Sequence, residues 1–452
     1  MKGFALFFIL LAPAVFAQKL PGKLTKQISS SVFSLSQVMM HDVVNPPAAS
    51  RYYAYGMLGA YEIVSQHDGT LPPLSSVIKN YKPISITSKN KYDAEIAAIY
   101  CILETGRLML PSGFKLADDE TAFLASVRHY KPDSSVIKAS VAVGEEVAAQ
   151  IVSFSKTDHY NELSAKMHYR PLRDDVHWYP TPPAYMEAIE PHWKTIRPMM
   201  IDSCNEFMPK PPVVFSKDSN SAFYNLAEEV YSVSKNRTKE QTEMAAFWDC
   251  NPFAVSTAGH MSIGFKKISP GGHWMSIAGI AAEKAHLSFD KSILLHTVLS
   301  VTLMDAFIAC WDEKYRSDRI RPETYINRYI NRRWEPLLQT PPFPEYPSGH
   351  SIVSTAAAEI LSYLLGDNFA FTDDSERLFD LPSRTFKSFR LAAEEAAISR
   401  LYGGIHFRDA VVSGQEMGAA LSAKIVAKMK AAGIAGFEPG LKKDRKVALQ
   451  RR

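Results

Sequence analysis

Apolar residues recur at intervals of three and four positions through nearly every long segment of this 452-residue chain, and strict alternation of apolar and polar residues is rare. The first pattern places apolar side chains on one face of a helix, whereas alternation is typical of strands. The sequence therefore predicts an all-α protein whose core is built by helix packing. The predicted helices cover residues 30–42, 46–67, 91–109, 117–129, 134–157, 218–235, 238–249, 274–287, 289–315, 349–366, 384–402 and 409–431.

A stretch rich in proline and aromatic residues interrupts this helical pattern. Residues 166–214 contain nine prolines together with Trp178, Tyr179, Tyr185 and Trp193, which is too aromatic for a disordered linker. A chain of this length is also expected to form more than one compact unit. We predict two helical bundles, 18–165 and 215–435, joined by residues 166–214 as an ordered crossover.

The N-terminus has the pattern of an export signal. Lys2 supplies the positive charge, Phe4 to Val15 the apolar stretch, and Val15-Phe16-Ala17 a small-residue cleavage site. We expect residues 1–17 to be removed. No cysteine follows the cleavage site, so no lipid anchor is expected, and the protein is predicted to be periplasmic or secreted.

The remaining chain has neither the charge of a nucleic-acid-binding protein nor a clear membrane span. Basic and acidic residues nearly balance, at 51 and 47, and the basic surplus lies in a tail, residues 436–452. The longest internal apolar stretch, Ile293–Trp311, contains His296 and Asp305. A buried helix is therefore expected there, without stable membrane insertion.

The four cysteines are expected to differ in role. Cys101 and Cys310 lie within apolar helical patterns and are predicted to be core residues. Cys204 and Cys250 lie in or near loops, where they are candidates for a disulfide in an exported protein.

The first of three segments rich in functional residue types is 311–322. If this segment is helical, Lys314 and Arg321 are seven residues apart, on one face and about 10.5 Å apart along the axis. Two cations at this spacing can flank one anion. The alternative interpretation is a solvated basic helix end.

The second segment, Pro347-Ser348-Gly349-His350, immediately precedes an apolar helix. Ser348 suits the N-cap position, Gly349 allows a backbone amide to approach an anion closely, and the helix N-terminus favours negative charge. His350 in the first turn can move a proton to or from a bound anion. An ordinary capped helix with a surface histidine is the alternative.

The third segment contains Arg400, Gly403-Gly404, His406 and Asp409. The glycine pair predicts the end of the helix that carries Arg400, and the following turn allows His406 to point back toward that arginine. Asp409 either orients the imidazole of His406 or caps the next helix.

Together the three segments supply three fixed cations, two neutral donors and two histidines, an inventory that suits a highly charged tetrahedral oxyanion. The chain resembles the superfamily of vanadium-dependent haloperoxidases and type 2 phosphatidic acid phosphatases in three motifs. These are Lys with six intervening residues before Arg-Pro, then Pro-Ser-Gly-His, and then Ser-Arg with five residues before His. The flanking Pro341–Tyr346 and Gly403–Phe407 resemble the soluble bacterial haloperoxidase branch. That resemblance implies two helical bundles with the site in the second one.

The resemblance also implies a role for each site residue. Vanadate would be the cofactor, with phosphate able to occupy the same site, and His406 would be the vanadium ligand or, in a phosphatase, the nucleophile. His350 would be the acid–base residue. The residues that neutralise or hydrogen-bond the anion would be Lys314, Arg321, Arg400, Ser348 and Gly349.

Two activities follow, of which haloperoxidase is favoured. Superfamily phosphatases usually place an aspartate four residues after the second histidine, whereas Asp409 follows His406 by three. We predict oxidation of iodide or bromide by hydrogen peroxide; the alternative is hydrolysis of small phosphoesters through a phosphohistidine. An oligomer is compatible with either activity.

His273 and Trp274 are secondary candidates for substrate contact. They lie in a segment similar to a Pro-Gly-His-Trp element of the haloperoxidases, and core packing is the alternative role.

Overall fold

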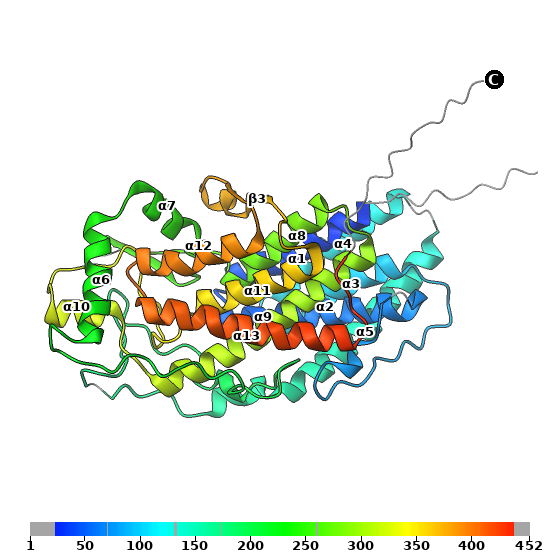
Figure 1. Ribbon diagram of the computed structural model, residues 1–452. Coiled ribbons are helices and arrows are strands. Elements are labelled where there is room, and N and C mark those ends of the chain that lie inside the picture. Colours follow the sequence, from blue (N-terminus) through cyan, green and yellow to red (C-terminus); the bar gives the residue numbers. More distant parts are fainter. Residues whose placement is uncertain (1–22, 70, 131–132, 173, 259–260, 438–452) are drawn as a thin grey trace, which may run out of the picture.

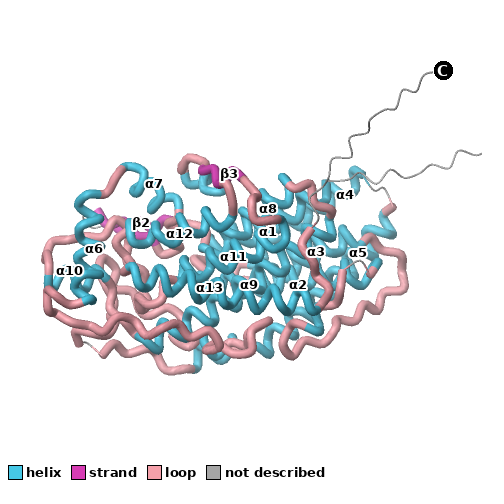
Figure 2. Tube along the Cα trace, viewed as in Figure 1, coloured by secondary structure: helices cyan, strands magenta, loops and turns pink. Residues whose placement is uncertain are grey.

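The computed structural model describes residues 23–69, 71–130, 133–172, 174–258 and 261–437, and over these residues the fold is dominated by helices (Figure 1, Figure 2). The predicted signal peptide and most of the basic tail lie outside the described residues. The helices are α1 (Lys23–His41), α2 (Pro46–Asp68), α3 (Ala94–Met109), α4 (Leu116–Tyr130), α5 (Ser134–Ser155), α6 (Ala222–Asn236), α7 (Lys239–Phe247), α8 (Pro270–Lys284), α9 (Phe289–Ser317), α10 (Pro322–Tyr329), α11 (Gly349–Leu365), α12 (Phe389–Tyr402) and α13 (Arg408–Ala431).

Side-chain caps fix where many of these helices begin. The side chains of Asn45, Ser269 and Ser348 accept hydrogen bonds from backbone amides in the first turns of α2, α8 and α11. Each cap satisfies an amide that has no partner within its own helix. The predicted starts of α2, α9 and α11 therefore agree with the observed ones, and the all-α prediction is confirmed.

Helix α9 forms the centre of the molecule. Its residues from Ser292 to Lys314 are all buried, and it packs against α2, α8 and α11 (Figure 1). Among the described residues α9 is the one helix long and apolar enough to cross a membrane, but its apolar window is entirely buried within the protein. One continuous hydrophobic core extends from Ile28 to Ile434, so helices of the N-terminal and C-terminal parts share it.

The proline-rich crossover is ordered against α9 by a buried carboxylate. Asp305, in the middle of α9, accepts hydrogen bonds from the backbone amides of Met199, Met200 and Ile201 at 2.6, 2.6 and 3.0 Å. Burial raises the pKa of Asp305 to about 6. The three donors satisfy a polar group that would otherwise be costly in the core.

Two local features differ from the sequence-based expectation. Residues 311–322 are not one helix, because α9 ends at Ser317 and Asp318 adopts the left-handed conformation with φ 46°. The crossover bonds to the chain at this break: the amide of Trp178 donates to the carbonyl of Asp318 at 2.8 Å. Four short strands also form two antiparallel hairpins, β1 (Ala254–Ala258) with β2 (Met261–Phe265) and β3 (Phe371–Asp373) with β4 (Arg384–Phe386).

All four cysteines are free thiols, so the candidate pair Cys204 and Cys250 does not form a disulfide. Cys250 is buried beside His273, with 3.3 Å between Sγ and Nδ1. Cys101 and Cys310 are fully buried core residues, as predicted.

Replacing Asp305 by alanine should lower the free energy of unfolding by about 3 kcal/mol, because three buried amides lose a charged acceptor. Asp305→Asn, which keeps one acceptor oxygen, should lose less. Thr302→Val is the matched control on α9, since the Thr302 hydroxyl bonds to a carbonyl of its own helix. Urea denaturation measures the effect, and equal losses for Asp305→Ala and Thr302→Val would contradict the assigned role of Asp305.

Candidate oxyanion site

The predicted site residues come together where the C-terminal ends of α9 and α12 meet the N-terminal end of α11. Lys314 lies in the last turn of α9, Arg321 is the N-cap residue of α10, and Ser348 is the N-cap residue of α11. Arg400 lies in the last turn of α12, and His406 follows the turn at Gly403-Gly404. Gly404 has φ +79°, and a Cβ placed on it would lie 3.1 Å from Pro336 and 3.2 Å from Trp334, so both the backbone conformation and the close packing favour glycine.

His406 is fixed by a carboxylate that the motifs did not reveal. Its Nδ1 lies 2.8 Å from Oε1 of Glu345, which also accepts from the amide of Phe407 at 2.9 Å. An Nδ1–H that donates to this carboxylate leaves the lone pair on Nε2. Burial and then the charges of Arg321 and Lys314 hold the pKa of His406 well below its usual value, so the imidazole is neutral.

Arg321 has one nitrogen free to bind a ligand. Its Nε donates to the carbonyl of Phe343 at 3.0 Å, and its Nη1 donates to the carbonyl of Ile405 at 2.9 Å and lies 3.2 Å from Nε2 of His406. Its Nη2 is buried and has no hydrogen-bond partner. Such unsatisfied donors are uncommon in folded proteins, so Nη2 is available to donate to a bound acceptor.

Lys314 is buried and bonded to the loop that precedes α11. Its Nζ donates to the carbonyls of Pro344, Glu345 and Pro347 at 3.0, 3.1 and 2.6 Å. Burial lowers the pKa of Lys314 to about 7. Lys314 Nζ and Arg321 Cζ each lie 5.1 Å from the ring centroid of Phe343, so the two cations remain close although the helix ends between them.

Arg400 is buried, and its charge acts on both His350 and His406. It donates to the Ser399 hydroxyl at 3.0 Å and to the carbonyl of Ala245 at 3.3 Å. Burial and then the charge of Arg400 lower the pKa of His350 well below its usual value. His350 is therefore neutral near pH 7, and its Nε2 is buried without a partner.

The start of α11 provides neutral donors beside these cations. The Ser348 hydroxyl oxygen accepts from the Ser351 hydroxyl at 2.8 Å, so its own hydrogen is available to a ligand. A Cβ placed on Gly349 would meet only atoms at 3.7 Å or more, including Cε of Lys314. The backbone at Gly349 therefore lies close to the side chain of Lys314.

Asp409 does not contact His406. It forms an ion pair with Arg319, whose Nε and Nη2 also bind Oε2 of Glu345 at 2.8 and 2.5 Å. The aspartate thus helps to position His406 only through Arg319 and Glu345. Phe407, without a capping side chain, is the N-cap of α13, so Asp409 is not the cap either.

The site therefore combines three buried cations and two unpartnered nitrogens with a single contacting carboxylate, Glu345. This arrangement fits a tetrahedral oxyanion, which would accept from Nη2 of Arg321 and approach Nε2 of His406. Glu345 escaped the sequence analysis because it lies 61 positions from His406. The signal that could have revealed it is an acidic residue in the proline-rich run 341–347.

Sulfate affinity should fall as the pH rises through about 7. A lysine with a lowered pKa is charged below that value and neutral above it, and a neutral Lys314 attracts the anion less. Sulfate stays fully ionised over this range, so the change reports on the protein. Calorimetric titration from about pH 6 to about pH 8.5 measures the affinity.

Lys314→Met should lower sulfate affinity about tenfold at low pH and remove the pH step. The exposed Lys217, which pairs with Asp175, gives the matched control Lys217→Met. A step that persists in Lys314→Met would contradict the assignment to Lys314.

Comparison with known proteins supports a family assignment. The family model of the VCPO second helical-bundle domain matches residues 294–333 and 330–433. No curated protein matches the chain. Two crystal structures of a bacterial vanadium-dependent chloroperoxidase share the fold. The apo form is 15% identical, with a TM-score of 0.65, and covers 87% of this chain and 95% of its own length. The holo form is 14% identical, with a TM-score of 0.61, and covers 87% of this chain and 94% of its own length.

The crystal structure of a bacterial vanadium-dependent iodoperoxidase is much more similar. It is 41% identical, covers 89% of this chain and 96% of its own length, and gives a TM-score of 0.84. This level of identity extends over nearly the whole of both chains. The structure of this chain also contains the cluster of three cations and the two histidines described above. The chain belongs to the family of vanadium-dependent haloperoxidases.

Proposed function

We propose that this protein oxidises iodide with hydrogen peroxide, using vanadate held in the candidate oxyanion site. The observation that carries the proposal is the pair formed by His406 and Arg321: Nε2 of His406 accepts from Nη1 of Arg321 at 3.2 Å, and the other terminal nitrogen of the same guanidinium, Nη2, is buried without a partner. Iodide is the favoured halide because the 41% identical relative is an iodoperoxidase. Bromide remains the second candidate.

In this proposal His406 would hold vanadate through Nε2. Arg321, Arg400 and Lys314 would neutralise the charge of the bound anion, and the Ser348 hydroxyl and the Gly349 amide would donate to it. Bound vanadate supplies Lewis acidity that activates hydrogen peroxide toward halide. The neutral His350 accepts a proton from hydrogen peroxide through its unpartnered Nε2.

The proposal also includes export of the protein from the cytoplasm. Cleavage after Ala17 would release a periplasmic or secreted enzyme, and the N-terminal sequence pattern supports this.

The central test is reconstitution. Protein incubated with vanadate should oxidise iodide with hydrogen peroxide, and His406→Ala should lower the rate at least about 100-fold because the proposed ligand is removed. His192→Ala is the matched control, since His192 lies in the crossover and bonds to the carbonyl of Met167. The same preparations are assayed for aryl-phosphate hydrolysis. Phosphatase activity without vanadate-dependent halide oxidation would overturn the proposal in favour of the phosphohistidine alternative.

Glu345→Gln should lower vanadate affinity about 10- to 100-fold, because the amide no longer holds a charged acceptor against Nδ1 of His406. Asp409→Asn is the matched control, since Asp409 binds the same Arg319 without touching His406. Equilibrium dialysis with vanadium counting measures the affinity. If both variants lose affinity equally, Glu345 acts only by holding Arg319, and its positioning of His406 is disproved.

A further inference from the structure

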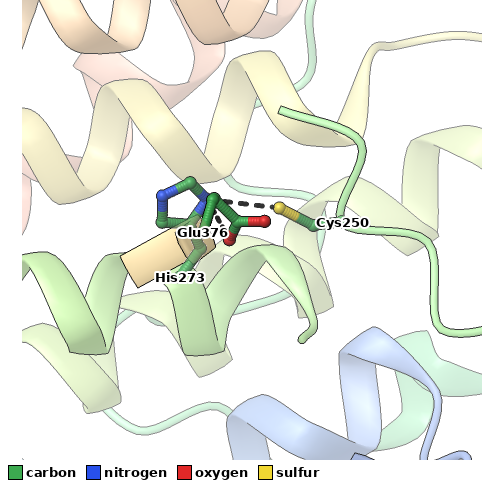
Figure 3. Close-up of side chains that lie close together, drawn as sticks. All are labelled: Cys250, His273 and Glu376. Carbon is green, nitrogen blue, oxygen red and sulfur yellow. Dashed lines mark hydrogen bonds and ion pairs between the residues drawn. The ribbon is translucent and has the colours of Figure 1, made fainter. Parts of the chain in front are cut away.

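A second buried cluster lies outside the oxyanion site. Among the described residues, Cys250, His273 and Glu376 form the one group of three side chains whose potential metal-ligand atoms lie within 4.8 Å of one another (Figure 3). They come from three separate parts of the chain: the segment after α7, the first turn of α8, and a short 3-10 helix, Ser375–Phe379. We propose that these three residues bind a divalent transition-metal ion of the zinc type.

The distances between the side chains match those around a tetrahedral ion. Nδ1 of His273 lies 3.3 Å from Sγ of Cys250 and 3.4 Å from Oε1 of Glu376. Zinc–sulfur and zinc–nitrogen bonds of about 2.3 and 2.0 Å place neighbouring ligand atoms about 3.5 Å apart. Both distances from His273 therefore match a tetrahedral zinc site, and all three ligand atoms lie within 4.8 Å of one another. Figure 3 shows the thiol and the carboxylate turned toward the same edge of the imidazole.

The opposite edge of the imidazole is held as in known metal sites. Nε2 of His273 lies 2.7 Å from Oδ2 of Asp373, and the other oxygen of Asp373 accepts from the amide and hydroxyl of Ser375. An Nε2–H that donates to Asp373 leaves the lone pair on Nδ1, which faces Cys250 and Glu376. Carboxylates orient zinc-binding histidines in the same way.

The carboxylate of Glu376 provides an independent indication of a ligand. Glu376 is 1% exposed, and its Oε1 is buried without a hydrogen-bond partner. A buried carboxylate oxygen without a donor is costly, and a bound cation removes that cost. The alternative without a metal is a protonated His273 whose Nδ1–H is shared by the thiol and the carboxylate.

The ligand types select the class of ion. A thiolate with an imidazole favours zinc or cobalt over magnesium or calcium, which prefer oxygen ligands only. Three protein ligands leave a fourth position for water. The complete burial of His273, at 0% exposure, and of Cys250, at 2%, points to an ion that is taken up during folding.

The proposed metal site is connected to the oxyanion site through Trp248. The ring of Trp248 stacks on His273 with 4.7 Å between centroids and 25° between planes. The backbone of Trp248 in turn forms a hydrogen bond with His350. A metal that fixes His273 would therefore steady the residue assigned to proton transfer. The proposal itself does not depend on vanadate binding.

Zinc analysis of the full-length protein tests the proposal. Protein expressed in zinc-supplemented medium and dialysed should contain about one zinc per chain, counted separately from vanadium by mass spectrometry. Cys250→Ser and Glu376→Gln should each reduce this to below about 0.2. Cys101→Ser and Glu62→Gln, at buried positions away from the cluster, should retain the zinc.

Cobalt provides a direct readout of the thiolate ligand. Protein expressed with Co²⁺ should show thiolate-to-cobalt charge-transfer absorption that is absent from Cys250→Ser. Circular dichroism establishes that each variant is folded, and the nearly isosteric Glu376→Gln serves as the second probe if Cys250→Ser does not fold. A wild-type zinc content below about 0.2 per chain, or zinc retained in Glu376→Gln, would overturn the proposal in favour of the hydrogen-bonded cluster.

Discussion

The structure depends on holding three positive charges together away from water. Like charges repel strongly in a buried environment, and each loses its hydration there. The protein compensates mainly with backbone dipoles: three carbonyls contact Lys314, two contact Arg321 and one contacts Arg400. Carbonyls stabilise a cation without neutralising it, so the site retains its attraction for an anion.

This compensation explains the irregular chain before α11. In a helix between α10 and α11, most backbone carbonyls would accept hydrogen bonds from amides of the same helix and could not contact the cations. The extended, proline-rich loop at 341–347 instead turns carbonyls of Phe343, Pro344, Glu345 and Pro347 toward Lys314 and Arg321. The same loop delivers the Glu345 carboxylate to His406. One segment without regular structure thus organises both the charges and the histidine.

The sequence predicted what depends on local chemistry. Helix periodicity and the Ser348 cap placed α11 to within one residue, and the three motifs named the cations and histidines that the fold brings together. Contacts between distant segments escaped prediction. The break after α9 depends on the crossover bonding at Asp318, Glu345 acquires its role only beside His406, and Cys250 faces His273 rather than Cys204.

The burial of α9 over nearly its whole length sets a rule for how such a chain can change. Asp305 and Lys314 lie on this single helix, the first bonded to the crossover and the second to the loop before α11. Inserting one residue between them would rotate one relative to the other by about 100°. Either the crossover or the cation would then lose its partners. Insertions and deletions are therefore expected in the loops, while the nine-residue spacing of Asp305 and Lys314 along α9 keeps the proline-rich crossover and the loop before α11 in register with each other.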